Sequence, residues 1–281
     1  MTRPANYQKP SGFTLIELII VILLIGILAG VLATILRGPV QASFDIQRRA
    51  SLVDIAETAL QRMTREIRLA LPNSVRLLGG DQGVEFLRTV DGGRYRADPP
   101  PGNRRLRFID TGAGLNGTFE VLGGFLNAAN ITANGAAGSQ NDCLAGLTDC
   151  LVVYNTGQAG ANAYNGDNVG AIQAVSATEL TFVRTGSGFP LESPQQRFQI
   201  VDTPVSFICD GADIFRYDSY TIGAVPTTGN ENLLIDKVTA CSFSYEPGAA
   251  TRAGLVTISL TVTDGSQSVT IMQQSHVDNQ P

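Results

Sequence analysis

A long apolar run near the N-terminus constrains this chain more than any other feature. It extends from Phe13 to Leu36 and contains a single charged residue, Glu17. As a helix the run is about 36 Å long, which is enough to cross a hydrocarbon layer of about 30 Å. A carboxylate at the centre of a spanning helix costs roughly 2.5–3.5 kcal/mol, and less near its ends. We therefore expect a membrane-spanning helix and a partner that offsets the cost of Glu17.

A free amino group would be such a partner. If the chain is cut between Gly12 and Phe13, the new N-terminal amine lies about one helical turn before Glu17. In a bundle of such helices, the carboxylate of one chain can also pair with the amine of the next. A cut at this position would therefore offset the cost of Glu17, either within one chain or between neighbouring chains.

Two other interpretations of the apolar run account for less of the sequence. A secretory signal peptide has an apolar region of about 7–15 residues, which is shorter than the run found here. A plain signal anchor explains the basic residues Arg3 and Lys9 before the helix through the positive-inside rule. It explains neither Glu17 nor the Gly12-Phe13 step at the edge of the run.

The segment Lys9–Gly12, followed by Phe13–Glu17 and the apolar helix, resembles the N-terminal signal of type IV prepilins and pseudopilins. In that family a membrane peptidase cuts after the glycine on the cytoplasmic side and methylates the new amine. The resemblance implies cleavage between Gly12 and Phe13, methylation of Phe13, and docking of the subunit through Glu17.

The same resemblance implies a location and a set of partners. The partners would be the prepilin peptidase, other major and minor pilins contacted through the N-terminal helix, and an inner-membrane assembly platform. The chain would cross the inner membrane once, with a cytoplasmic N-terminus and a periplasmic C-terminal domain. Incorporation into a surface pilus is a further expectation.

The residues after the apolar run follow an amphipathic pattern. Apolar side chains recur at steps of three and four, which is typical of a helix with one buried face. They are Leu52, Ala56, Ala59, Leu60, Met63, Ile67, Ala70 and Leu71. Pro39 is expected to kink or restart the helix, and Pro72-Asn73 to end it.

Beyond Pro72 the chain has short alternating runs bounded by turn residues, which predict β-strands. The expected strands are Ser74–Leu78, Val84–Val90, Leu106–Asp110, Thr118–Leu122, Leu151–Tyr154, Glu179–Arg184, Arg197–Val201, Val205–Cys209, Asp213–Tyr217, Lys237–Tyr245, Leu255–Thr263 and Ser268–Gln274. Hairpin turns are expected at Asp91-Gly92-Gly93, Asp210-Gly211-Ala212 and Asp264-Gly265-Ser266. Residues 112–175 are rich in Gly, Ala and Asn, and we expect long loops there.

A long helix on antiparallel strands is an α+β arrangement. The resemblance to type IV prepilins implies that this arrangement is a pilin-like fold. The expected organisation is a leader at residues 1–12, a transmembrane or filament-core helix at 13–36, an amphipathic helix at 37–72 and a β-rich periplasmic domain at 73–281.

Four cysteines, Cys143, Cys150, Cys209 and Cys241, lie beyond the apolar run. An even number in an exported domain indicates disulfides. Of the three possible pairings we favour Cys143–Cys150 and Cys209–Cys241, whose loops are worth about 2.5 and 3.7 kcal/mol in the chain-entropy model. A zinc site is the alternative, but there is no CxxC pair, and the single histidine, His276, is distant in sequence.

No catalytic constellation stands out in the sequence, so we expect a protein that is not an enzyme and has no cofactor. A Ser-His-Asp set would depend on His276, and no G-x-S-x-G motif occurs. Gly112, Gly114 and Gly117 match the dinucleotide-binding spacing, but a strand-like stretch follows them instead of a helix.

Two weaker binding hypotheses remain. Asp142, Asp149 and Asp167 lie near a disulfide loop but lack the regular spacing of a calcium loop, so no metal is expected. The amphipathic helix carries the arginines Arg48, Arg49, Arg62, Arg65 and Arg68. No aromatic residues interleave with them to stack on bases. The net charge of −5 becomes two units more negative without the leader, and this negative charge also argues against nucleic acid as a partner.

Two later stretches narrow the resemblance. The first contains Phe189-Pro190, Ser193-Pro194 and Arg197-Phe198, followed by Val205–Asp210. The second is Ile235–Tyr245, together with the tail His276–Pro281. They resemble the O-type minor pilin of mannose-sensitive haemagglutinin (MSHA) pili and, more loosely, the J-type minor pseudopilins of type II secretion. The resemblance implies a non-enzymatic subunit that helps to start or support a pilus. The alternatives are a secretion pseudopilin, and an adhesive or DNA-binding pilin that uses the 112–175 loops or the arginines.

Overall fold

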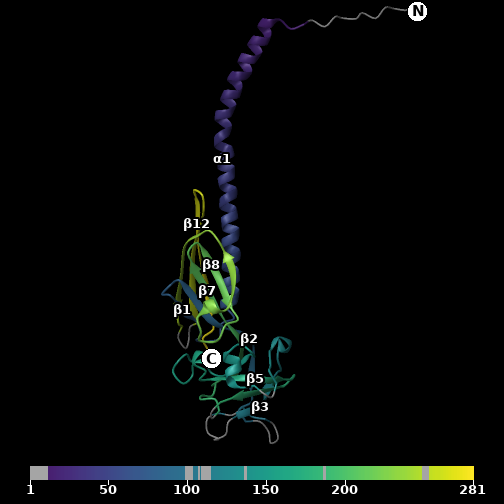
Figure 1. Cartoon of the computed structure of the whole chain (residues 1–281), viewed down its shortest axis with the longest axis vertical. Helices are drawn as coiled ribbons and strands as arrows, with labels where there is room; N and C mark the ends of the chain where they lie inside the picture. The colour runs from purple at the N-terminus through teal and green to yellow at the C-terminus, as the bar shows by residue number, and fades with distance from the viewer. Residues whose placement is uncertain are drawn as a thin grey trace, which may run out of the picture. The chain divides into compact units, whose positions relative to one another are not determined.

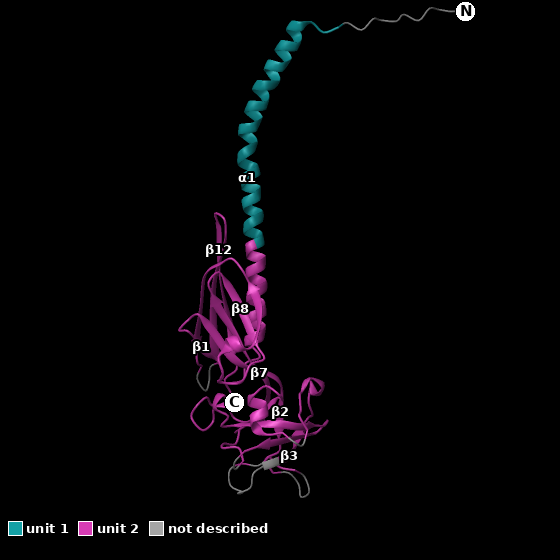
Figure 2. Ribbon diagram, in the orientation of Figure 1, with its two compact units in different colours: residues 1–51 teal, residues 52–281 magenta. Residues whose placement is uncertain are grey.

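The computed structural model describes residues 12–98, 104–106, 108, 115–135, 138–185, 188–248 and 253–281. The chain divides into two compact units, residues 1–51 and 52–281 (Figure 2). The expected leader, apart from Gly12, lies outside the described residues. A long helix precedes a mostly antiparallel β domain, which confirms the α+β class (Figure 1).

Helix α1 runs from Leu15 to Ile67 and passes through Pro39 without a break. The helix therefore does not restart at Pro39. The other expectation, a kink at this residue, stays a prediction. A proline removes one backbone donor and costs about 3 kcal/mol in a helix interior. The helix nevertheless continues without interruption on both sides of Pro39.

The C-terminal part of α1 carries the predicted apolar stripe. Leu52, Ala56, Leu60, Met63 and Ile67 are all buried, which confirms the helical spacing read from the sequence. The stripe packs in one core with side chains of both sheets of the β domain. The domain is thus built around this part of the helix.

The helix ends five residues before Pro72, so the predicted end is wrong. The amides of Leu69 and Ala70 bond to carbonyls three residues earlier, which tightens the last turn. The amide of Leu71 then donates to the carbonyl of Leu87 at 2.8 Å, and that of Thr89 to Leu69 at 2.8 Å. Pairing with a strand replaces the helical hydrogen bonds at this point.

The described residues contain a nine-stranded sheet and a three-stranded sheet. The first is built from β1 (Arg76–Leu78), β2 (Gly83–Tyr95), β3 (Leu115–Leu122), β4 (Cys150–Val152), β5 (Val169–Val175), β6 (Glu179–Arg184), β7 (Arg197–Asp210), β8 (Asp213–Asp218) and β9 (Asn230–Ile235). The second contains β10 (Val238–Glu246), β11 (Gly254–Asp264) and β12 (Gln267–Val277). Short helices are η1 (Ala128–Asn130), α2 (Gln140–Leu144), η2 (Ala163–Asn165) and η3 (Pro226–Thr228).

Strands β2 and β7 pair along most of their length and link two lobes of the β domain (Figure 1). Residues Thr89–Tyr95 of β2 and Arg197–Val201 of β7 pair with each other and with β3, β6, β5 and β4. The six paired segments close into a small barrel. A buried cluster with side chains from all six strands fills its interior. The other ends of β2 and β7 form a sheet with β1, β8 and β9 that packs against α1 and the three-stranded sheet.

The predicted hairpin at Asp91-Gly92-Gly93 is wrong, because β2 continues straight through these residues. A methyl group on Gly92 would lie 3.0 Å from the carbonyl oxygen of Phe198, and one on Gly93 would lie 2.9 Å from its ring. The glycines therefore permit close approach of β7 and do not form a turn.

The prediction of long loops at residues 112–175 is also wrong in part. The described portion contains β3, β4, β5 and the short helix α2, and only β4 and the end of β3 were foreseen. Strand β9 was missed, and the two strands expected at 197–209 form the single strand β7. Of the strand expected at Leu106–Asp110, only Leu106 and Phe108 are described, and Phe108 makes an isolated bridge to Phe189.

The other two turns follow the sequence. Asp210 pairs with Asp213 and Asp264 pairs with Gln267, so each hairpin has a two-residue loop that contains glycine. The disulfides join Cys143 with Cys150 and Cys209 with Cys241, which is the pairing favoured from the sequence. The first links α2 to β4, and the second links β7 to β10 across the two sheets.

Candidate functional site

The segment at the start of α1 carries the residues predicted for processing and docking. Gly12 and Phe13 precede the helix, and the Phe13 side chain is exposed. Thr14 caps the helix, since its Oγ1 accepts a hydrogen bond from the Glu17 amide at 3.3 Å. Glu17 lies in the first turn with an exposed side chain and makes no ion pair with another described residue.

The part of α1 from Leu15 to Leu36 exposes its apolar side chains on every face. Within unit 1, every large apolar residue from Leu15 to Leu36 is at least two-fifths exposed. Among the described helices, α1 alone is long and apolar enough to cross a membrane, by its length and composition. A helix that is apolar all round requires lipid or other helices as its surroundings.

The three aspartates weighed as calcium ligands bond instead to backbone amides. Asp142 accepts from the amide of Ser139 at 2.8 Å, and Asp167 from that of Gly160 at 3.0 Å. Asp149 is buried and accepts from the amide of Thr132 at 2.9 Å. Burial raises the pKa of Asp149 to about 6. No cluster of three or more metal-ligating side chains occurs in the described part of the chain.

The other sequence candidates are dispersed. Among the helix arginines, Arg62 contacts Glu66 at 3.5 Å on an exposed face, while Arg65 and Arg68 are exposed. His276 lies on β12 opposite Leu255, with its side chain exposed. Of the three spaced glycines, Gly112 and Gly114 lie outside the described residues. Gly117 lies within β3 against the ring of Phe182.

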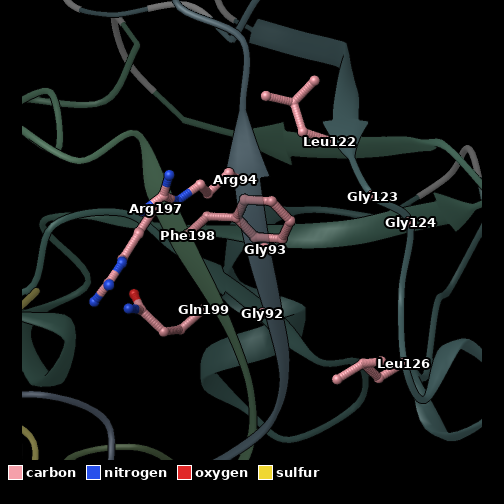
Figure 3. Close-up of a pocket in the computed structure, with 10 residues that line it drawn as sticks. All are labelled: Gly92, Gly93, Arg94, Leu122, Gly123, Gly124, Leu126, Arg197, Phe198 and Gln199. Carbon is pink, nitrogen blue, oxygen red and sulfur yellow. The ribbon is translucent and has the colours of Figure 1, made fainter.

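Sequence reasoning missed a hollow in the β domain, where β2 and β3 separate. The two strands pair only at Arg94–Leu122 and Tyr95–Val121. Next to these pairs lies a hollow of about 410 Å³, lined by Gly92, Gly93, Arg94, Leu122, Gly123, Gly124, Leu126, Arg197, Phe198 and Gln199 (Figure 3). The register of β2 on β7 places Arg94 opposite Arg197. No local sequence motif identifies the two arginines as a pair.

The comparisons with known proteins bear on the N-terminal segment. Residues 8–33 match the family of the prokaryotic N-terminal methylation motif. The chain has no significant match among curated proteins or among solved structures. The matched segment includes the candidate cleavage site at Gly12-Phe13 and Glu17. It supports a type IV pilin-like or pseudopilin-like protein, a structural class that is processed by prepilin peptidase and assembles with other pilins.

Proposed function

We propose that this protein is a minor pilin-like subunit that assists the assembly or initiation of a type IV pilus of the MSHA type. The observation that carries the proposal is the methylation motif at residues 8–33 at the head of a helix with exposed apolar side chains. Cleavage after Gly12 would release the amine of Phe13, which is then methylated. The β domain would lie in the periplasm until the subunit enters a filament.

In this proposal Glu17 docks each subunit by pairing with the N-terminal amine of a neighbour. An ionised carboxylate in an apolar environment is costly unless it is paired. The exposed apolar helix favours the same arrangement, because a bundle of such helices replaces lipid contacts with protein contacts. The N-terminal amine and Glu17 would then lie inside that bundle.

Counting surface pili by electron microscopy in a strain that lacks this gene tests the proposal. Loss or rarity of pili would support a role in initiation or assembly. Normal pili together with a defect in protein secretion would favour a pseudopilin and contradict the pilus role. Mass spectrometry of the purified protein should find Phe13 as a methylated N-terminus.

Glu17→Gln tests the docking step in the same strain. The substitution removes the charge but keeps the backbone amide that donates to Thr14. We expect normal cleavage and poor incorporation into pili. Glu57→Gln is the matched control, because it removes a carboxylate from an exposed position on the same helix beyond the apolar run. Equal incorporation of both variants would contradict the docking role.

A further inference from the structure

Two adjoining hollows form one groove on the β domain. The hollow in Figure 3 shares Gly92, Leu126, Arg197 and Gln199 with a second one of about 350 Å³. Arg94 lines the first hollow only, and Arg68 lines the second only. We call the combined surface the arginine groove. It lies where β2 and β7 pass from the helix-packed lobe to the barrel.

Arg94 and Arg197 are directly opposite each other in the β2–β7 ladder. Directly opposed residues in an antiparallel pair point to the same face with Cβ atoms about 4.5–5.5 Å apart, and like charges there repel. Figure 3 shows Arg197 and Gln199 on one side of β7 and Phe198 on the other. Phe198 belongs to the buried cluster of the barrel. The two guanidinium groups therefore share one patch of surface.

These two arginines lack the partners that nearby arginines have. No ion pair among the described residues involves Arg94 or Arg197, whereas Arg96 contacts Glu120 at 3.7 Å and Arg104 contacts Glu179 at 3.6 Å. A bound carboxylate would accept from both guanidinium groups and offset their repulsion. An anionic ligand would therefore give both cations the partner that they lack among the described residues.

Acidic side chains of the groove do not neutralise the patch. Asp91 is buried, and its two oxygens accept from the amides of Gly92 and Asn127, both at 2.7 Å. The other carboxylate, that of Asp278, lines the second hollow and accepts from the amide of Gln280 at 3.0 Å. With three arginines against these two carboxylates, the groove keeps a positive charge.

The groove is long enough for an extended segment. The amide of Thr89 bonds to Leu69, the neighbour of Arg68, and Thr89 lies five residues before Arg94 on β2. Five residues of strand span about 17 Å, so an extended peptide of about six residues reaches from Arg68 to the arginine pair.

The lining favours a peptide over a nucleic acid. Leu126 is 92% exposed and Leu122 is 38% exposed, so the groove offers apolar contacts beside its charges. Its single aromatic, Phe198, is buried and offers no face on which a base could stack. Arginine clusters with adjacent apolar surface are a recurring way to bind acidic peptide motifs.

We propose that the arginine groove binds an extended acidic segment of a partner protein. Carboxylates at one end of the segment pair with Arg94 and Arg197, and those at the other end pair with Arg68. Apolar side chains between them contact Leu126. The site is independent of the N-terminal segment and does not rest on the proposed filament role.

The test measures binding of a fluorescein-labelled polyglutamate peptide of about six residues to the full-length protein in detergent, by fluorescence anisotropy. We expect saturable binding that weakens about tenfold or more in the double variant Arg94→Gln/Arg197→Gln. Arg104→Gln is the matched control, since it removes one exposed cation from the same lobe. Its affinity should stay within about twofold of the unaltered protein. Arg94→Lys/Arg197→Lys should retain part of the binding, which separates charge from misfolding.

Several results would overturn the proposal. Absence of saturable binding, or equal weakening by Arg104→Gln and the double variant, would mean that the groove has no special role. Tighter binding of an oligogalacturonate or a single-stranded DNA of equal charge would assign the groove to a different class of ligand. Loss of binding in the Arg68→Gln variant alone, with the double variant unaffected, would remove the arginine pair from the site.

Discussion

Arg216 of β8 and Glu66 of α1 form an ion pair in which both side chains are largely shielded from solvent. The Nε atom of Arg216 lies 2.8 and 3.0 Å from the two carboxylate oxygens of Glu66. Arg216 also donates to Asp218 on the same strand. The pair ties the last turns of the helix to the sheet within the β domain. It adds a directional, charged contact to the burial that the apolar stripe supplies.

Glu66→Gln should lower the free energy of unfolding of the β domain by about 1–3 kcal/mol, because a shielded guanidinium loses a charged partner and keeps only Asp218. Urea unfolding of the full-length protein, followed by tyrosine fluorescence since the chain has no tryptophan, measures this change. The control is Arg62→Gln, which breaks the exposed pair between Arg62 and Glu66 and should cost less than about 0.5 kcal/mol. Equal effects would show that the Arg216 contact adds nothing.

The sequence specifies the local elements of this fold better than their pairing. The stripe from Leu52 to Ile67 is a local pattern, and it was predicted residue by residue. The turns after Asp210 and Asp264 carry an Asp-Gly signal and form hairpins. Asp91-Gly92 is also an Asp-Gly step, yet no hairpin turn forms there. Gly92 and Gly93 instead allow Phe198, a residue more than a hundred positions away, to approach the strand closely.

The candidate functional residues also differ in whether they can be predicted from a local sequence pattern. Gly12, Phe13 and Glu17 form a local motif that can be read directly from the sequence. Arg94 and Arg197 meet only because β2 and β7 pair in one register, which no single-sequence pattern gives. Strand β5 was missed because Val169–Val175 lies in a stretch whose Gly and Ala content resembles a loop. Its place between β4 and β6 is set by barrel closure.

Arg94→Gln should stabilise the unliganded protein. Two cations directly opposite each other in a ladder repel, and removing one should raise the free energy of unfolding by about 0.2–1 kcal/mol. Urea unfolding at low salt measures the gain, which should shrink as salt screens the repulsion. Arg104→Gln is the control, since losing its contact with Glu179 should leave stability unchanged or slightly lower. A loss of stability in Arg94→Gln would indicate that a carboxylate already neutralises the pair.

Asp149 should make the stability of the β domain depend on pH. Burial raises its pKa to about 6 from an ordinary value of 3.8, so the folded state binds more protons between these values than the unfolded state does. Stability contributed by the protonated form is therefore present below about pH 4 and is lost as pH rises through about 6.

Asp149→Asn tests this linkage, because an amide keeps an oxygen that can accept from the amide of Thr132. Relative to the unaltered protein, the variant should gain about 1–3 kcal/mol at pH 7.5 and close to nothing at pH 4. Urea midpoints of both proteins at the two pH values give the difference directly. The same difference at both pH values would mean that Asp149 titrates as an ordinary exposed carboxylate.

Gly93→Ala should destabilise the barrel. The added methyl group would lie 2.9 Å from the ring of Phe198 and 3.2 Å from Val121. Phe198 is buried and packs edge-on against Phe119 with ring centroids 5.2 Å apart, so it has little room to move. Overpacking of this kind costs about 1–3 kcal/mol, which urea unfolding can detect.

Gly38→Ala is the companion variant, because a methyl group there meets no atom within 4 Å in the described structure. It lies in the separate unit that contains the apolar run, and it should change the unfolding of the β domain by less than about 0.5 kcal/mol. If Gly93→Ala were equally harmless, Phe198 would have to shift without loss of packing. The close approach of β2 and β7 would then not explain why glycines occupy this part of the strand.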